Sequence, residues 1–138
     1  MNYELQLVLI PVSDVDRAKH FYTEKAGFAL NADHQPSDDF RVVQCTPPGS
    51  ACSIGFGIGI NDSTPGSARG LHLVVQDVEK ARETLRERGV DVSSVRHMSQ
   101  TGWQPGIHPG REDYASFADF ADPDGNTWVL QEVGHGSG

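Results

Sequence analysis

The sequence predicts an α+β protein made of two tandem modules, each with the element order β-α-β-β-β. A repeated segment is the first observation: residues 12–18 (VSDVDRA) and 75–81 (VQDVEKA) share four identical positions. Each segment follows a short apolar run and leads into the apolar spacing of an amphipathic helix. The length is the second observation, because 138 residues suffice for one shared core but not for two separate cores.

The first strand and the helix of each module follow from side-chain alternation and helix capping. Residues 5–10 and 70–75 have the composition of short strands. Asp14 and Asp77 follow these strands at the positions of N-caps, since a short carboxylate accepts bonds from the free N–H groups of a first helical turn. Two glycines then stand where a left-handed residue ends a helix, Gly27 and Gly89.

Three further strands are expected after each helix. In the first module they cover residues 27–31, 40–45 and 51–60, and in the second 90–95, 114–120 and 126–133. The turn at 122–125 (DPDG) carries proline and glycine where a tight turn favours them. We therefore expect one domain over residues 1–138, with the boundaries as follows: modules at about 1–60 and 69–133, a linker at 61–68, an extra loop at 97–113 and a flexible tail at 134–138.

The charge balance indicates which classes of binding partner to expect. The formal net charge is −8, and nucleic-acid binding relies on clustered cations, so we expect no nucleic-acid partner. The same sign disfavours an anionic membrane surface, and no window reaches the roughly 18–20 apolar residues of a membrane span. Only two cysteines are present, which indicates a cytoplasmic location rather than a disulfide framework.

The sequence resembles the vicinal oxygen chelate superfamily, which includes glyoxalase I, bleomycin-resistance proteins and extradiol dioxygenases. The resemblance covers nearly the whole chain and rests on residues 11–14 (PVSD), 21–22 (FY), 27–28 (GF) and 120–126 (FADPDGN). It implies a glyoxalase-like cupped sheet around a central pocket. It also implies a homodimer, which the open edges of the modules favour.

Metal-dependent members of this superfamily hold their ion with side chains at set positions, and this chain departs from them. The resemblance places these positions at Leu7, Gly70 and Val129, none of which has a side-chain donor. Residues 51–60, where some members carry a further carboxylate, hold no carboxylate or histidine. A divalent ion needs several N, O or S ligands. We therefore expect no metal and no other cofactor.

The candidate ligand-binding residues come from alternation within the expected strands and from the extra loop. His72 lies two residues after Gly70, so the two are expected on the same face of the strand. It is the best candidate for catalysis, although a hydrogen-bonded histidine in the core is the simpler interpretation. Trp103 offers a stacking surface for a flat ligand or an anchor for its loop. Phe56 is expected to face the pocket, with neighbouring glycines under a helix. Gln131 shares a face with Val129, and its amide either binds a polar group of a ligand or bonds to His72, to backbone or to buried water. The complete candidate set is Leu7, Leu9, Phe56, His72, Trp103, Tyr114, Val129 and Gln131.

Two functions compete at this point. The first is a metal-free protein of the bleomycin-resistance type, which binds a small organic molecule in the cavity between its two modules. The second is a lyase, isomerase or dioxygenase of the same superfamily, which uses a displaced site near His72 and Gln131. The absence of donors at the metal positions favours the first.

Overall fold

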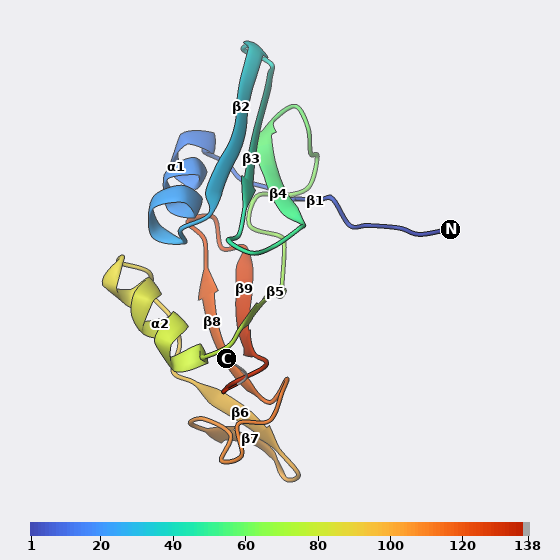
Figure 1. The fold of residues 1–138 in the computed structure, drawn as a ribbon. Helices are drawn as coiled ribbons and strands as arrows, with labels where there is room; N and C mark the ends of the chain where they lie inside the picture. Colours follow the sequence, from blue (N-terminus) through green and yellow to red (C-terminus); the bar gives the residue numbers. More distant parts are fainter. Residues whose placement is uncertain (137–138) are drawn as a thin grey trace. The chain divides into compact units, whose positions relative to one another are not determined.

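The computed structural model describes residues 1–136, which divide into two compact units. Unit 1 contains Met1–Ala68 together with Asp122–Asn126, and unit 2 contains Arg69–Ala121 and the chain from Thr127 onward. Each unit has its own β-sheet and its own helical segment (Figure 1). The expected α+β fold of two modules is confirmed.

Unit 1 contains a four-stranded sheet with the strand order β1-β4-β3-β2. Strand β1 pairs in parallel with β4, and the other pairs are antiparallel. The helix of this unit, α1 (Val15–His20), is followed directly by a π-helical turn at Phe21–Lys25. The elements in chain order are β1 (Leu7–Leu9), α1 (Val15–His20), β2 (Ala29–Ser37), β3 (Phe40–Thr46) and β4 (Ser53–Ile58).

Unit 2 repeats this arrangement and adds one strand, in the order β5-β9-β8-β6-β7. Strand β5 pairs in parallel with β9, as β1 pairs with β4 in unit 1. The elements in chain order are β5 (Leu71–Val75), α2 (Val78–Glu87), β6 (Arg96–Ser99), β7 (Gly102–Pro105), β8 (Ser116–Ala121) and β9 (Thr127–Glu132). The shared parallel pair shows that the two modules are copies of one architecture.

Both helices begin and end as the sequence predicts. The side chain of Asp14 accepts a bond from the backbone N–H of Arg17, and Asp77 accepts one from Lys80, each at 3.0 Å. Beyond the helices, Gly27 and Gly89 have φ values of 80° and 88°, which confirms left-handed glycines at both ends. Among residues 1–136, neither helix has the length and apolar character needed to cross a membrane.

The strand expected at residues 90–95 is wrong, because this segment is irregular and β6 begins only at Arg96. Its alternation is real, since Val90 and Val92 are buried. Its hydrogen bonds do not follow the regular pattern between paired strands. Ser93 donates its N–H to the Asp119 carbonyl at 2.8 Å, while its own carbonyl accepts from Arg82 Nε at 2.7 Å. Ser93 Oγ then accepts the Asp119 N–H at 2.8 Å.

The extra loop expected at residues 97–113 contains regular structure. Strands β6 and β7 form an antiparallel hairpin within it, in which Met98 pairs with Trp103. The first expected strand after α1 is also longer than the 27–31 predicted, because β2 runs to Ser37. In the expected tail, the Gly134 N–H donates to Asp113 Oδ1 at 2.7 Å, and residues 137–138 lie outside the described residues.

The turn that joins β8 to β9 is held by buried hydrogen bonds within unit 1. Asp122 Oδ1 accepts the backbone N–H groups of Asp124 and Asn126, at 3.0 and 2.9 Å. Its Oδ2 accepts the Tyr22 hydroxyl at 2.7 Å and the Asn126 side-chain amide at 2.8 Å. The same amide donates to the Pro11 carbonyl at 2.9 Å. The Asp122 carboxylate therefore accepts four hydrogen bonds and ties the turn together.

Removing the Tyr22 hydroxyl should destabilise the protein without changing its fold. Tyr22 is fully buried, so Tyr22→Phe leaves Asp122 Oδ2 with one partner fewer in a place that water does not reach. We expect a loss of about 1–2 kcal/mol in the free energy of unfolding, measured by urea denaturation. The control is Tyr3→Phe at an exposed tyrosine. Equal stability of both variants would contradict the role given to this bond.

Candidate functional site

The sheet of unit 2 has one covered face and one open face. In β9, Trp128, Leu130 and Glu132 are buried, while the residues between them are only half buried. Strand β8 alternates in the same way, because Ser116, Ala118 and Phe120 are buried. The buried sets lie on the side of α2, as side chains alternate across a strand. The opposite face is not covered by a helix of this unit, and we call it the open face.

Strand register aligns many side chains of the open face in two rows that run across its strands. One row joins Val74 of β5, Gln131 of β9, Phe117 of β8 and Arg96 of β6. The second row joins His72 of β5, Val129 of β9 and Asp119 of β8. Members of a row lie on neighbouring strands about 4.8 Å apart, close enough for side chains to touch. The open face therefore combines apolar, aromatic, amide and charged groups on one platform.

An aromatic and charged cluster forms the β6–β7 side of the open face. The rings of Trp103 and Phe117 meet edge to face, with centroids 5.3 Å apart. The Arg96 guanidinium carbon lies 4.8 Å from the Trp103 ring centroid and 5.7 Å from that of Phe117. Asp119 pairs with the two terminal nitrogens of Arg96 at 2.6 and 3.2 Å. Trp103 nevertheless keeps 51% of its surface exposed, so one side of the indole remains accessible.

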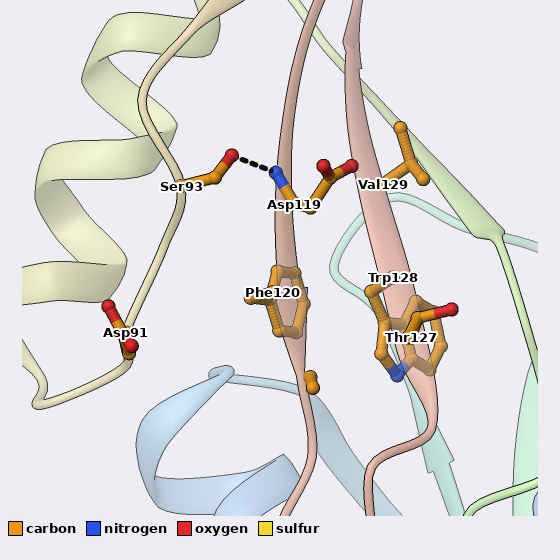
Figure 2. Close-up of a pocket in the computed structure, with 8 residues that line it drawn as sticks. Asp91, Ser93, Asp119, Phe120, Thr127, Trp128 and Val129 are labelled. Atoms are coloured by element: carbon orange, nitrogen blue, oxygen red, sulfur yellow. Dashed lines mark hydrogen bonds between the residues drawn. The ribbon is translucent and has the colours of Figure 1, made fainter.

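A hollow of about 510 Å³ adjoins the open face. This volume is in the range of small-molecule sites. Figure 2 shows Asp119 and Val129 on the neighbouring strands β8 and β9, and the Ser93 hydroxyl bonded to the backbone of Asp119. Because Asp119 also binds Arg96, it links the hollow to the aromatic cluster. The lining residues are Asp91, Ser93, Asp119, Phe120, Ala121, Thr127, Trp128 and Val129.

Four of the candidate residues share the open face of unit 2: His72, Trp103, Val129 and Gln131. His72 is exposed, and its Nδ1 lies 2.6 Å from the Gly70 carbonyl oxygen. The half-buried side chain of Gln131 has no hydrogen-bond partner among residues 1–136. His72 is therefore not a core histidine, and the amide of Gln131 is not bonded to another protein group within residues 1–136.

Three candidates lie in unit 1, on two different faces. Leu7 and Leu9 lie over Gly55, because a Cβ atom at Gly55 would meet their side chains at 3.3 and 3.2 Å. Phe56 lies on the helix side, where its ring centroid is 5.6 Å from that of the buried Tyr22. The expected orientation of Phe56 is therefore wrong. Phe56 packs against the buried Tyr22 ring on the helix side of the strand. Gly55 therefore lies on the opposite side, beneath Leu7 and Leu9.

Tyr114 stands apart from the other candidates, in the segment that precedes β8. It is 63% exposed and has a φ of 65°, which is unusual for a residue with a side chain. Arg111, at φ 49°, anchors this segment. Its Nη2 and Nε donate to Glu132 at 2.6 and 3.2 Å, and its guanidinium also reaches Asp77 and Glu79. The strained backbone is thus held by a bidentate charged pair.

Glu132 is a fully buried carboxylate on the covered face. Its negative charge is stabilised by the Arg111 guanidinium and by the backbone N–H of Val78 at the start of α2. Burial by itself raises the pKa of Glu132, but the Arg111 side chain and the Val78 backbone N–H donate to the carboxylate and hold its pKa below the usual value. The pKa of Arg111 is raised in turn, chiefly by the bonds to Glu132. The ionised pair therefore contributes to folding at neutral pH.

The residues at the expected metal positions do not fit a metal ion. Leu7 and Val129 have hydrocarbon side chains and Gly70 has none, so these positions offer no lone pair of a side chain. His72 is the nearest candidate for a displaced ligand, and the next open-face side chain in its row is Val129. Within residues 1–136, no group of three or more His, Cys, Asp or Glu side chains is arranged to hold an ion.

Sequence reasoning missed three residues of the aromatic and charged cluster: Arg96, Phe117 and Asp119. A signal for two of them was present. The tight turn at 122–125 joins two strands as a hairpin, and its register places Phe117 opposite Gln131 and Asp119 opposite Val129. Arg96 carried no such signal, because the hairpin of β6 and β7 that brings it to Trp103 was expected to be a loop.

Comparisons with known proteins agree with this fold. A family model described as Glyoxalase/Bleomycin resistance protein/Dioxygenase superfamily matches residues 4–130. The structure is similar to TnmS3, an antibiotic binding protein from Streptomyces sp. CB03234, with 37% sequence identity and a TM-score of 0.73. That match covers 95% of this chain and 96% of TnmS3.

Two further similarities extend over nearly the whole chain. A member of the same superfamily from Sphaerobacter thermophilus DSM 20745 is 29% identical, with a TM-score of 0.74, over 96% of this chain and 98% of the other. The uncharacterized protein YetH of Bacillus subtilis (strain 168) is 23% identical over 133 residues, which cover 96% of this chain and 100% of YetH.

Lowering the pH should destabilise the protein, partly because Glu132 becomes protonated. A carboxylate whose pKa is lower in the folded state contributes stability above its unfolded pKa, near 4.3, and loses it as the pH falls through the folded value. We expect Glu132→Gln to be less stable at pH 7, because Arg111 loses its shortest and most buried ion pair. The free energies of unfolding of the two proteins should approach each other from pH 5 to pH 3. The control is Glu4→Gln at an exposed position; a gap that stays constant with pH would contradict the assignment.

Divalent cations should leave the melting temperature unchanged. An ion bound to the native state at 100 times its Kd would add about 2.7 kcal/mol of stability. We expect differential scanning fluorimetry with 100 µM Ni²⁺, Zn²⁺, Mn²⁺ or Fe²⁺ to match a sample treated with EDTA. A reproducible rise with one of these ions would show that a metal site exists.

Proposed function

Because the chain belongs to the Glyoxalase/Bleomycin resistance protein/Dioxygenase superfamily, we propose that it binds a small, flat organic molecule on the open face of unit 2, without a metal ion. Fold alone does not assign a function within such a family, so the proposal rests on the chemistry of the face. The likeness to an antibiotic binding protein over nearly the full length of both chains supports a small-molecule ligand.

The half-exposed Trp103 is the observation that carries this proposal. An indole fixed by Phe117 and Arg96 loses little conformational freedom when a ligand stacks on it, which favours binding. A flat aromatic molecule suits such a surface, because offset and edge-to-face contacts add to the burial of apolar area. The adjoining hollow gives the remainder of the molecule a place beside Thr127 and Val129.

Catalysis near His72 and Gln131, the alternative hypothesis, has weaker support. A general base requires a partner that orients it, and the imidazole of His72 is bonded only to the Gly70 carbonyl within residues 1–136. Its neighbour in the row is Val129, which offers no group for proton transfer. The open face is suited to binding, and binding is the function we propose.

Truncation of Trp103 should weaken the binding of a flat aromatic probe. We choose 2-acetylnaphthalene and isothermal titration calorimetry, which needs no optical signal from the tryptophan itself. Trp103→Ala should lower the affinity about fivefold or more, since stacking contributes of the order of 1 kcal/mol. Trp103→Phe should retain part of it.

Tyr3→Ala is the matched control, because Tyr3 is an exposed aromatic residue of unit 1. It should bind the probe as the wild type does. The proposal would be wrong if the wild type did not bind the probe, or if Trp103→Ala and Tyr3→Ala changed the affinity equally.

A further inference from the structure

Arg96 has hydrogen-bonding capacity that the protein itself does not use. A guanidinium carries five N–H donors. Asp119 takes one from each terminal nitrogen, and no other acceptor among residues 1–136 takes the rest. The Arg96 side chain is 32% exposed, so these donors are accessible from the open face.

The orientation of Arg96 is fixed before any ligand arrives. Its guanidinium carbon lies over the rings of Trp103 and Phe117, and Asp119 holds its terminal nitrogens in a bidentate pair. The Asp119 backbone is itself tied to Ser93 in both directions. A fork of donors held in this way loses less freedom on binding an acceptor than a mobile side chain would.

Gln131 places a second unused polar group on the same row. Phe117 has Gln131 as its partner on β9 and Arg96 as its partner on β6. The two polar side chains therefore start from strands on either side of the Phe117 ring, with backbones roughly 10 Å apart. A flat molecule lying over Phe117 would bring its edges to these two groups.

We propose that Arg96, assisted by Gln131, selects ligands that carry an acceptor oxygen, such as a carbonyl or phenolic oxygen, at the edge of an aromatic ring system. This inference rests on the proposed function and adds the chemical class of the ligand. Asp119 balances the charge of Arg96, so the cluster attracts a neutral acceptor without requiring an acid. That is consistent with a chain whose net charge is −8.

The test compares two probes of nearly the same shape, 2-acetylnaphthalene and 2-ethylnaphthalene, of which only the first has an acceptor oxygen. Affinities are measured by quenching of tryptophan fluorescence. The wild type should prefer the ketone about tenfold, since a bond to a charged donor is stronger than one to a neutral donor. Arg96→Met, which keeps an unbranched apolar stem, should reduce the preference to within about twofold. Gln131→Met should reduce it partly.

Arg86→Met is the matched control, at an exposed arginine of α2, and it should keep the preference of the wild type. The double variant Arg96→Met with Asp119→Asn removes the ion pair as a whole, so that an unpaired Asp119 does not confuse the result. It should lose the preference as the single variant does.

Failures of the inference and of the proposed function are distinguishable. If Arg96→Met keeps the preference for the ketone, or if the wild type binds both probes equally, the assignment to Arg96 is wrong while the binding face stands. If the wild type binds neither probe, the proposed function fails and the inference fails with it.

Discussion

The register between β8 and β9 decides which side chains reach the open face of unit 2. The turn at 122–126 sets this register, because Ala121 and Thr127 pair directly on its two sides. Side chains alternate with a period of two, so a slip of one residue would bury Phe117 and Asp119 and expose Phe120. The Asp122 carboxylate opposes such a slip, since it binds two N–H groups of its own turn together with the Tyr22 hydroxyl.

The chemistry of the face follows from this arrangement. A cation among apolar groups is costly unless it is paired, and Asp119 supplies the pair without occupying all the donors of Arg96. The rings beside Arg96 cover part of the guanidinium and leave the indole of Trp103 half exposed. The platform thus places polar groups on the inner strands among apolar and aromatic side chains, which suits a binding surface that recognises both shape and the position of an acceptor.

The sequence alone predicted the repeated module, both helix caps and the glycines beyond the helices, because these depend on local chemistry at Asp14, Asp77, Gly27 and Gly89. It also predicted that Gln131 and Val129 share a face, which needs only strand alternation. It failed at residues 90–95, where the backbone and hydroxyl of Ser93 bind the backbone of Asp119 in place of the regular hydrogen bonds between two strands. It failed again at Phe56, since the choice between two faces of a strand depends on a distant partner, Tyr22.

The indole N–H signals of the two tryptophans test the central claim most directly. Trp103 is half exposed on the open face and Trp128 is 2% exposed on the covered face. In ¹H–¹⁵N spectra, assigned with Trp103→Phe, a titration with 2-acetylnaphthalene should shift the Trp103 indole signal in a saturable way. The backbone amides of Arg96, Phe117 and Gln131 should shift at the same probe concentrations. A probe that binds while the Trp103 signal and these amides stay in place would contradict the account.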